Sequence, residues 1–297
     1  MDLMICGMCG AQHDTRAIKS CKVCDDPRQY VPPEGQTWTT LREMQRSKKY
    51  QNLLVPDKYD SGVVSIYTTP QVAIGQRALL LCTEKGNLLW DCITYLDDDT
   101  VRAVNDLGGI AAIVISHPHY YSTALHWAAA FDCKVYLSAE DSDWIMRRGD
   151  AHVLWDGPRM DFLDGQFTAA KVGGHFPGSS VLLWKDRKKL FVADSITVIP
   201  SGVYHVNRPP NTASFTFMWS YPNMEAVLLK LTSKIPLPPE EVYQIWKSVE
   251  DLDFEDTHGA FITRDTRGES KQRMLDSAKL FIKFMGYIDH PIHKVTL

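Results

Sequence analysis

The chain has 297 residues, of which 44% are hydrophobic and 23% charged, a composition typical of a globular protein that can bury a full core. Its formal net charge is −4 and no long run of one sign occurs, so a nucleic-acid partner is not expected. No stretch approaches the roughly eighteen apolar residues that cross a bilayer, and no leader pattern opens the chain. We therefore expect no membrane partner and a cytoplasmic location.

Four of the seven cysteines form two CxxC pairs near the N-terminus, with Cys6 and Cys9 in the first and Cys21 and Cys24 in the second. A two-residue gap lets both thiolates of a pair face one ion, and two pairs complete a tetrahedral four-sulfur shell. The segment resembles a zinc ribbon, and equally a rubredoxin-like domain, which holds iron in the same cage. We predict a module and linker over residues 1–38, with a structural Zn²⁺ or a redox-active iron, and a main domain over residues 39–297.

After a proline-rich linker the pattern indicates short strands first, and later strands that alternate with helices. Strands are predicted over residues 63–68, 78–82, 87–91, 111–115 and 134–137. Helices are predicted over residues 40–50, 97–107, 123–131, 139–147, 224–232, 239–249 and 266–285. This order favours a mixed sandwich of strands and helices.

The apolar strand predicted over residues 111–115 runs directly into the sequence SHPHYYS at residues 116–122. Two histidines one residue apart at the end of a buried strand bring two imidazoles to the rim of a sheet, where both can bind one ion. Taken alone, the pair is equally compatible with two rim histidines that water or a carboxylate satisfies.

Four segments, in order, resemble the motifs of the metallo-β-lactamase-fold superfamily. The first is HPHYYS at residues 117–122, in place of that family's HxHxDH. The others are GGHFPGS at residues 173–179, KLFVAD at 189–194 and THG at 257–259. The resemblance implies an α+β fold, a four-layer αββα sandwich with a metal at one edge of two packed sheets.

The resemblance also implies that His117, His119 and His175 bind one ion, Zn²⁺ or iron, with Asp194 as a further ligand. Tyr121 and Ser122 stand where two-metal members carry an aspartate and a histidine. Because a phenol and a hydroxyl are poor ligands near neutral pH, we predict a mononuclear site with an empty or weak second position.

Without that aspartate, acid–base work falls to Asp194 or His258, and Tyr121 is a candidate hydrogen-bond donor to a developing oxyanion. The stretch over residues 199–222 is rich in aromatic residues and proline, which suits a pocket wall. An aromatic patch for homodimer contact is the alternative reading of that stretch. The candidates for contact with substrate are Tyr120, His205, Arg208 and Trp219.

The function predicted first is hydrolysis of a small-molecule ester, amide, thioester or lactone by a single metal-activated water. One alternative is a non-haem iron oxidoreductase in which the cysteine module relays electrons. Another is a binding protein whose site has lost catalysis, because one scaffold hosts many functions.

Overall fold

The computed structural model describes residues 2–26, 28, 31, 35–203, 211–220 and 235–297. The chain divides into two compact units, Met1–Asp156 and Gly157–Leu297. The predicted helix over 224–232 and the pocket candidates His205 and Arg208 lie outside the described residues. Among the described helices, none combines the length and the apolar character needed to cross a membrane. The predicted boundary after residue 38 stays a prediction.

The N-terminal part of the first unit is built around one short antiparallel pair of strands, β1 (Met4–Cys6) and β2 (Trp38–Thr40). Helix α1 (Leu41–Ser47) begins where β2 ends. Its first turn is closed by a capping box, in which Thr40 and Glu43 each accept a hydrogen bond from the other's backbone N–H. The four cysteines of the CxxC pairs are buried together in a small apolar cluster beside this pair of strands.

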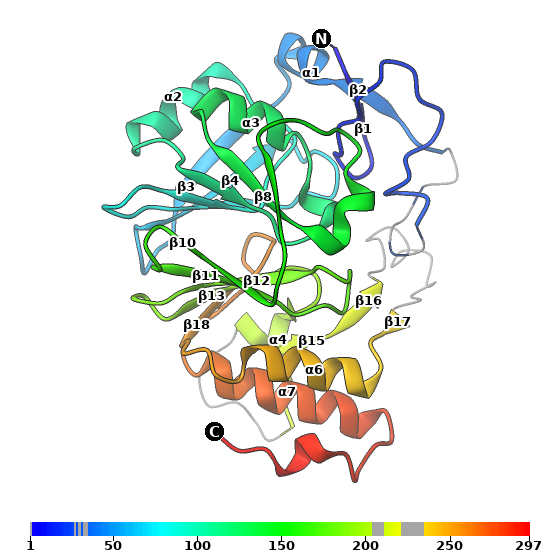
Figure 1. The fold of residues 1–297 in the computed structure, drawn as a ribbon, viewed down its shortest axis with the longest axis vertical. Coiled ribbons are helices and arrows are strands. Elements are labelled where there is room, and N and C mark those ends of the chain that lie inside the picture. Colours follow the sequence, from blue (N-terminus) through cyan, green and yellow to red (C-terminus); the bar gives the residue numbers. More distant parts are fainter. Residues whose placement is uncertain (1, 27, 29–30, 32–34, 204–210, 221–234) are drawn as a thin grey trace. The chain divides into compact units, whose positions relative to one another are not determined.

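The first unit contains a seven-stranded sheet with the strands in sequence order. Its first four strands pair antiparallel, and the later neighbours from β6 onward pair parallel. Helices α2 (Asp98–Asp106) and α3 (Ala124–Phe131) make the crossovers between parallel strands (Figure 1). The strands are β3 (Gln51–Pro56), β4 (Val63–Thr69), β5 (Ala78–Leu81), β6 (Leu88–Trp90), β7 (Ala112–Val114), β8 (Lys134–Ser138) and β9 (His152–Trp155).

The second unit has a six-stranded sheet in the order β10-β11-β12-β13-β18-β19. Within it, β13 and β18 are parallel, with Phe191 opposite His258, so the residues that follow both strands emerge at the same edge. The strands are β10 (Arg159–Phe162), β11 (Phe167–Lys171), β12 (Ser180–Trp184), β13 (Lys189–Phe191), β18 (Asp256–His258) and β19 (Asp265–Thr266).

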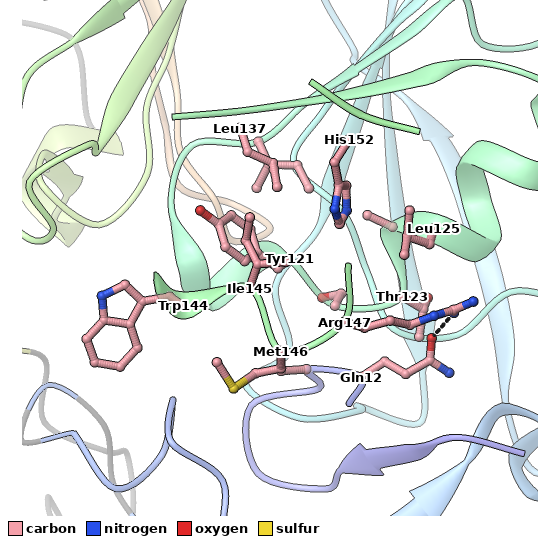
Figure 2. A pocket seen from close by; sticks show the side chains of 14 residues that line it. Gln12, Tyr121, Thr123, Leu125, Leu137, Trp144, Ile145, Met146, Arg147 and His152 are labelled. Atoms are coloured by element: carbon pink, nitrogen blue, oxygen red, sulfur yellow. Dashed lines mark hydrogen bonds between the residues drawn. The ribbon is translucent and has the colours of Figure 1, made fainter. Parts of the chain in front are cut away.

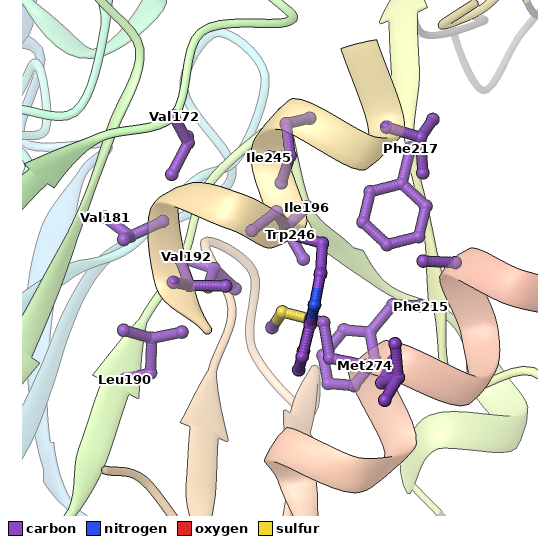
Figure 3. Close-up of a cluster of buried hydrophobic side chains, with 14 of the residues drawn as sticks. Val172, Val181, Leu190, Val192, Ile196, Phe215, Phe217, Ile245, Trp246 and Met274 are labelled. Atoms are coloured by element: carbon purple, nitrogen blue, oxygen red, sulfur yellow. The ribbon is translucent and has the colours of Figure 1, made fainter. Parts of the chain in front are cut away.

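Helices α6 (Pro239–Val249) and α7 (Ser270–Phe284) pack side by side in the second unit (Figure 1). Their apolar faces meet the sheet in one buried cluster that includes Val192, Trp246 and Met274 (Figure 3). The shorter elements are β14 (Thr197–Val198), α4 (Pro200–Val203), β15 (Phe215–Thr216), β16 (Met218–Ser220), β17 (Ile235–Pro236) and η3 (Pro291–Lys294).

Most predicted elements that fall on described residues are confirmed within a few residues, and α6 has the predicted bounds. The helix predicted over 139–147 is wrong, since a 3₁₀ helix, η2 (Ala139–Trp144), gives way to extended backbone at Ile145. The carbonyl of Met146 accepts a hydrogen bond of 3.2 Å from Asp14 N, so this stretch is held by the N-terminal segment rather than by a helical turn. Strand β3 was not predicted.

Candidate metal centres

The four cysteines of the two CxxC pairs come together as the sequence predicts. Their Sγ atoms all lie within 4.8 Å of one another, with Cys6 to Cys24 at 3.5 Å and Cys9 to Cys21 at 3.8 Å. Four thiolates at about 2.3 Å from a tetrahedral ion lie about 3.8 Å apart, so the spacing fits a Zn²⁺ or iron ion and no disulfide is formed. The cluster is compatible with the predicted zinc ribbon.

The packed sulfurs strongly change one another's acidity. Hydrogen bonds from Cys24 and its neighbours hold the pKa of Cys21 well below its ordinary value. The pKa values of Cys9 and Cys24 are raised, in both cases mainly by the hydrogen bond to Cys21. His13 adds a contact of 3.3 Å from Nε2 to the sulfur of Cys21. The pKa of Cys6 is lowered as well, so the four thiols differ in acidity, and deprotonation of all four requires a cation.

The predicted histidine pair lies at the carboxyl end of β7. Asp91, which follows the parallel neighbour β6, accepts a hydrogen bond of 2.8 Å from the backbone N–H of Ser116. The hydroxyl of Ser116 lies 2.9 Å from Nδ1 of His117, which leaves Nε2 as the ring nitrogen for another ligand. The rings of His117 and His119 lie edge to face at 5.1 Å, and both side chains are buried. The pair thus has the preorganisation typical of metal-binding histidines.

The residues after the pair form a short 3₁₀ turn, η1 (Pro118–Tyr120). Tyr120, predicted to contact substrate, is fully buried and packs its ring at 4.7 Å against His117. The hydroxyl of Tyr121 is buried in the first unit and has no hydrogen-bond partner among the described residues. Burial, with Asp141 nearby, raises the pKa of Tyr121 well above its ordinary value, so this phenol stays protonated near neutral pH.

In the second unit, His175 lies on the loop between β11 and β12, and Asp194 follows β13. Nδ1 of His175 is 2.7 Å from the carbonyl oxygen of Trp219, which can only accept, so Nδ1 carries the proton. Nε2 is then an acceptor, yet it faces a carboxylate oxygen of Asp194 at 3.7 Å. Two acceptors that face each other repel unless a cation lies between them. The imidazole nitrogen of His175 and the carboxylate oxygen of Asp194 are two of the ligand types that bind a tetrahedral metal ion.

Ser195 braces the loop that carries His175. Its hydroxyl accepts a hydrogen bond of 3.1 Å from the backbone N–H of His175 and donates one of 2.6 Å to the carbonyl of Gly173. Gly174 in this loop has a φ of +81°, which favours glycine, and a Cβ there would lie 2.9 Å from a methyl of Leu237. The loop geometry therefore depends on residues outside the histidine motif.

His258 is the last predicted site residue, at the end of β18. Its ring stacks on Phe191 at 5.1 Å. Arg267 Nη1, which can only donate, is 3.1 Å from Nε2, and Asp265 Oδ1 is 3.4 Å from Nδ1. Nε2 of His258 thus lies beside a guanidinium and Nδ1 faces a carboxylate, both within the second unit.

The backbone carbonyl of Trp219 fixes the tautomer of His175, while its side chain packs against the core cluster. Spacing in the sequence did not reveal Asp91, Ser116 or Ser195. The one available signal was Asp91, because an aspartate at the end of a predicted strand is a recurrent site position in sheets with parallel strands. The catalytic and pocket roles of Tyr120, Tyr121, His258 and Trp219 stay predictions.

Comparison with known proteins agrees with this fold. The family model described as the metallo-beta-lactamase superfamily matches residues 74–252. The chain is 38% identical over 294 residues to "Uncharacterized protein YmaE" of Bacillus subtilis (strain 168), an alignment that covers 96% of this chain and 98% of that protein.

Solved structures share this fold. VMB-1 has a TM-score of 0.53 at 12% identity, over 79% of this chain and 99% of that one. The DIM-1 metallo-beta-lactamase has a TM-score of 0.51 at 11% identity, over 78% of this chain and 97% of that one. At these identities the likeness is one of fold, and it agrees with the α+β class predicted from the sequence. The chain belongs to the metallo-beta-lactamase superfamily, as a member with a divergent first motif and an N-terminal four-cysteine cluster.

Proposed function

We propose that this protein is a metal-dependent hydrolase of a small-molecule ester, amide, thioester or lactone. One catalytic ion would be bound by the residues that the family motifs supply, His117, His119, His175 and Asp194. A second ion, Zn²⁺, would be bound by the four cysteines in a structural role.

The observation that carries the proposal is the arrangement of His175 and Asp194. The proton on Nδ1 of His175 is fixed by a carbonyl, and Nε2 opposes a carboxylate that is only 7% exposed. A buried carboxylate needs a cation or hydrogen-bond donors to offset the loss of hydration. Superfamily membership favours a metal ion over a second proton on the imidazole, because this motif supplies a metal ligand in that family.

Three imidazoles and a carboxylate suit Zn²⁺ or a similar divalent ion. An ion bound there supplies a Lewis acid, which brings the pKa of a bound water toward about 7. The protein's own contribution is to fix each ligand, through Ser116 at His117 and through the Trp219 carbonyl at His175. Asp194 is the carboxylate proposed to orient the water and take its proton.

A single catalytic ion is favoured by the surroundings of His258. Arg267 donates to Nε2 of that histidine, and a guanidinium beside this nitrogen repels a second cation. Tyr121, with its raised pKa, also stays a neutral phenol. We propose that His258 acts as a positioning or proton-transfer group rather than as a ligand.

The test combines metal analysis with a hydrolase screen on protein purified without added metal. Wild-type protein is expected to carry one Zn²⁺ at each of the two sites and to hydrolyse at least one class of ester, amide, thioester or lactone. His119→Ala is expected to lose the histidine-site ion and to lower turnover by a factor of at least about 10³ while the cysteine-bound ion is retained.

His293→Ala is the matched control, because it removes a histidine that contacts the carbonyl of Tyr287 near the C-terminus. Its metal content and turnover are expected to match wild type. Turnover that survives in His119→Ala contradicts the proposal. Iron at either site, seen as a visible absorption that dithionite bleaches, contradicts it in favour of the oxidoreductase alternative.

A further inference from the structure

The N-terminal cysteine cluster is packed against the turn that carries the histidine pair, entirely within the first unit. Thr94 Oγ1 donates a hydrogen bond of 3.3 Å to the carbonyl of Gly10, which directly follows Cys9. A Cβ on Gly10 would lie 2.1 Å from Oγ1 of Thr94, and the φ of +80° at Gly10 favours glycine. Thr94 in turn accepts, through its carbonyl, a bond of 2.8 Å from Thr123 Oγ1. The cysteine segment thus contacts residues that hold the turn.

Ser122 is the strained residue of this turn. Its φ of +43° lies in the left-handed region, which costs a non-glycine residue on the order of 1 kcal/mol or more unless neighbours hold it. The backbone N–H of Gln12 donates a bond of 3.1 Å to the carbonyl of Ser122. Gln76 Nε2 donates to the hydroxyl of Ser122 at 3.3 Å, and that hydroxyl lies 3.3 Å from the carbonyl of Cys92. Part of the restraint on Ser122 therefore comes from the N-terminal segment.

The side chain of Gln12 makes a second connection, three residues after Cys9. Its Oε1 accepts a hydrogen bond from Arg147, drawn in Figure 2, and its Nε2 lies 3.1 Å from Nε2 of His126 on α3. Gln12 is only 4% exposed, so these bonds are shielded from water. The module is thereby tied to the end of the turn at Ser122, to α3 at His126 and to Arg147.

We propose that the cysteine module acts as a clamp, in the sense that its contacts restrain residues 117–123, the histidine turn. An ion bound by the four cysteines then strengthens metal binding by His117 and His119. The cysteine-bound ion fixes the position of residues 6–12, and those residues restrain the backbone of Ser122, three residues after His119. By linkage, an ion on the histidines strengthens metal binding by the cysteines by the same factor. The affinity part of this inference rests on the proposed ion at the histidines.

The experiment titrates the protein with Co²⁺ against a chelator, because only the thiolate site gives sulfur-to-metal charge-transfer absorption and the two sites are read separately. Hydrogen exchange of residues 117–123, followed by mass spectrometry, is the second readout. Cys24→Ser disrupts the cysteine site, and we expect roughly tenfold weaker Co²⁺ binding at the histidines together with faster exchange of the turn.

Gln12→Ala keeps all four cysteines and the backbone bond to Ser122, removes the side-chain bonds to Arg147 and His126, and so tests the side-chain part of the clamp even if Cys24→Ser does not fold. We expect an intact thiolate spectrum, about fivefold weaker binding at the histidines and faster exchange over residues 117–123. Lys22→Ala is the matched control, since Lys22 Nζ donates a hydrogen bond of 2.9 Å to the carbonyl of Asp143. This is a contact of the module away from the turn. This variant is expected to behave like wild type.

Unchanged exchange and unchanged histidine-site affinity in Gln12→Ala overturn the clamp. Equal losses in Gln12→Ala and Lys22→Ala also overturn it, because they indicate general loosening of the module. If wild-type protein binds no ion at the histidines, the proposed function fails, while the exchange of residues 117–123 still decides whether the module restrains the turn.

Discussion

At the scale of single residues, the protonation of several histidines is set by their immediate neighbours. Burial, together with the charges of Arg148 and Arg147, lowers the pKa of His152 to about 4. Burial also lowers the pKa of His126, with Arg147 as the next cause. Nδ1 of His152 is buried, with no hydrogen-bond partner among the described residues. Both rings are therefore neutral in the folded first unit at pH 7.

These lowered values predict that the first unit loses stability in mild acid. In the unfolded chain His152 takes up a proton near pH 6.5, whereas the folded state takes it up only near pH 4. The free energy of unfolding should therefore fall as pH drops from about 6.5 to about 4, by up to about 3 kcal/mol from this residue, and level off below that. Urea unfolding at a series of pH values measures the change. His152→Gln should flatten the profile, and an unchanged slope would rule out this residue as the cause.

The proposed ligand residues stand in motifs that the sequence displays, but the residues that orient them do not. His117, His119, His175 and Asp194 stand in motifs whose order along the chain is recognisable. The partner of His175 Nδ1 is a backbone carbonyl, at Trp219, and no side-chain pattern encodes such a partner. For the same reason Trp219 was assigned to a pocket wall from its aromatic side chain alone.

At the scale of elements, parallel strand pairs bring together the site residues of each unit. The ends of β6 and β7 join Asp91 to the residue before His117, and the ends of β13 and β18 place Asp194 and His258 at one edge. Helix α6 was predictable because a proline and two glutamates open an amphipathic pattern. The end of η2 at Trp144 was not, since it depends on a hydrogen bond between Asp14 and Met146, far apart in the chain.

The loop between β11 and β12 supplies a prediction at this scale. Ser195→Ala removes both hydrogen bonds of the hydroxyl and leaves the N–H of His175 and the carbonyl of Gly173 without that partner. We expect a loss of about 1–3 kcal/mol in unfolding free energy and weaker metal binding by His175. Urea unfolding and metal titration check it. Ser248→Ala, which removes a bond to Gln244 on an exposed helix face, should cost less than about 0.5 kcal/mol. Equal small effects in the two variants would contradict the bracing role.

At the scale of the whole molecule, the chain combines the superfamily fold with a four-cysteine module that lies before the matched family segment. The module could be predicted from cysteine spacing alone, because two CxxC pairs allow few other structures in a chain without disulfides. Its role toward the histidine turn could not, because that role depends on Gln12 and Ser122, which carry no motif. The homodimer and the cytoplasmic location stay predictions.

The central claim is that two metal sites of different chemistry exist in one chain, one of sulfur and one of imidazole. Anomalous scattering from crystals of protein purified without added metal, recorded on both sides of the zinc and iron absorption edges, tests it most directly. The account predicts one zinc peak among the sulfurs of Cys6, Cys9, Cys21 and Cys24, and a second peak bound by His117, His119, His175 and Asp194. A map without a peak at the histidines, or with two ions there, would contradict it.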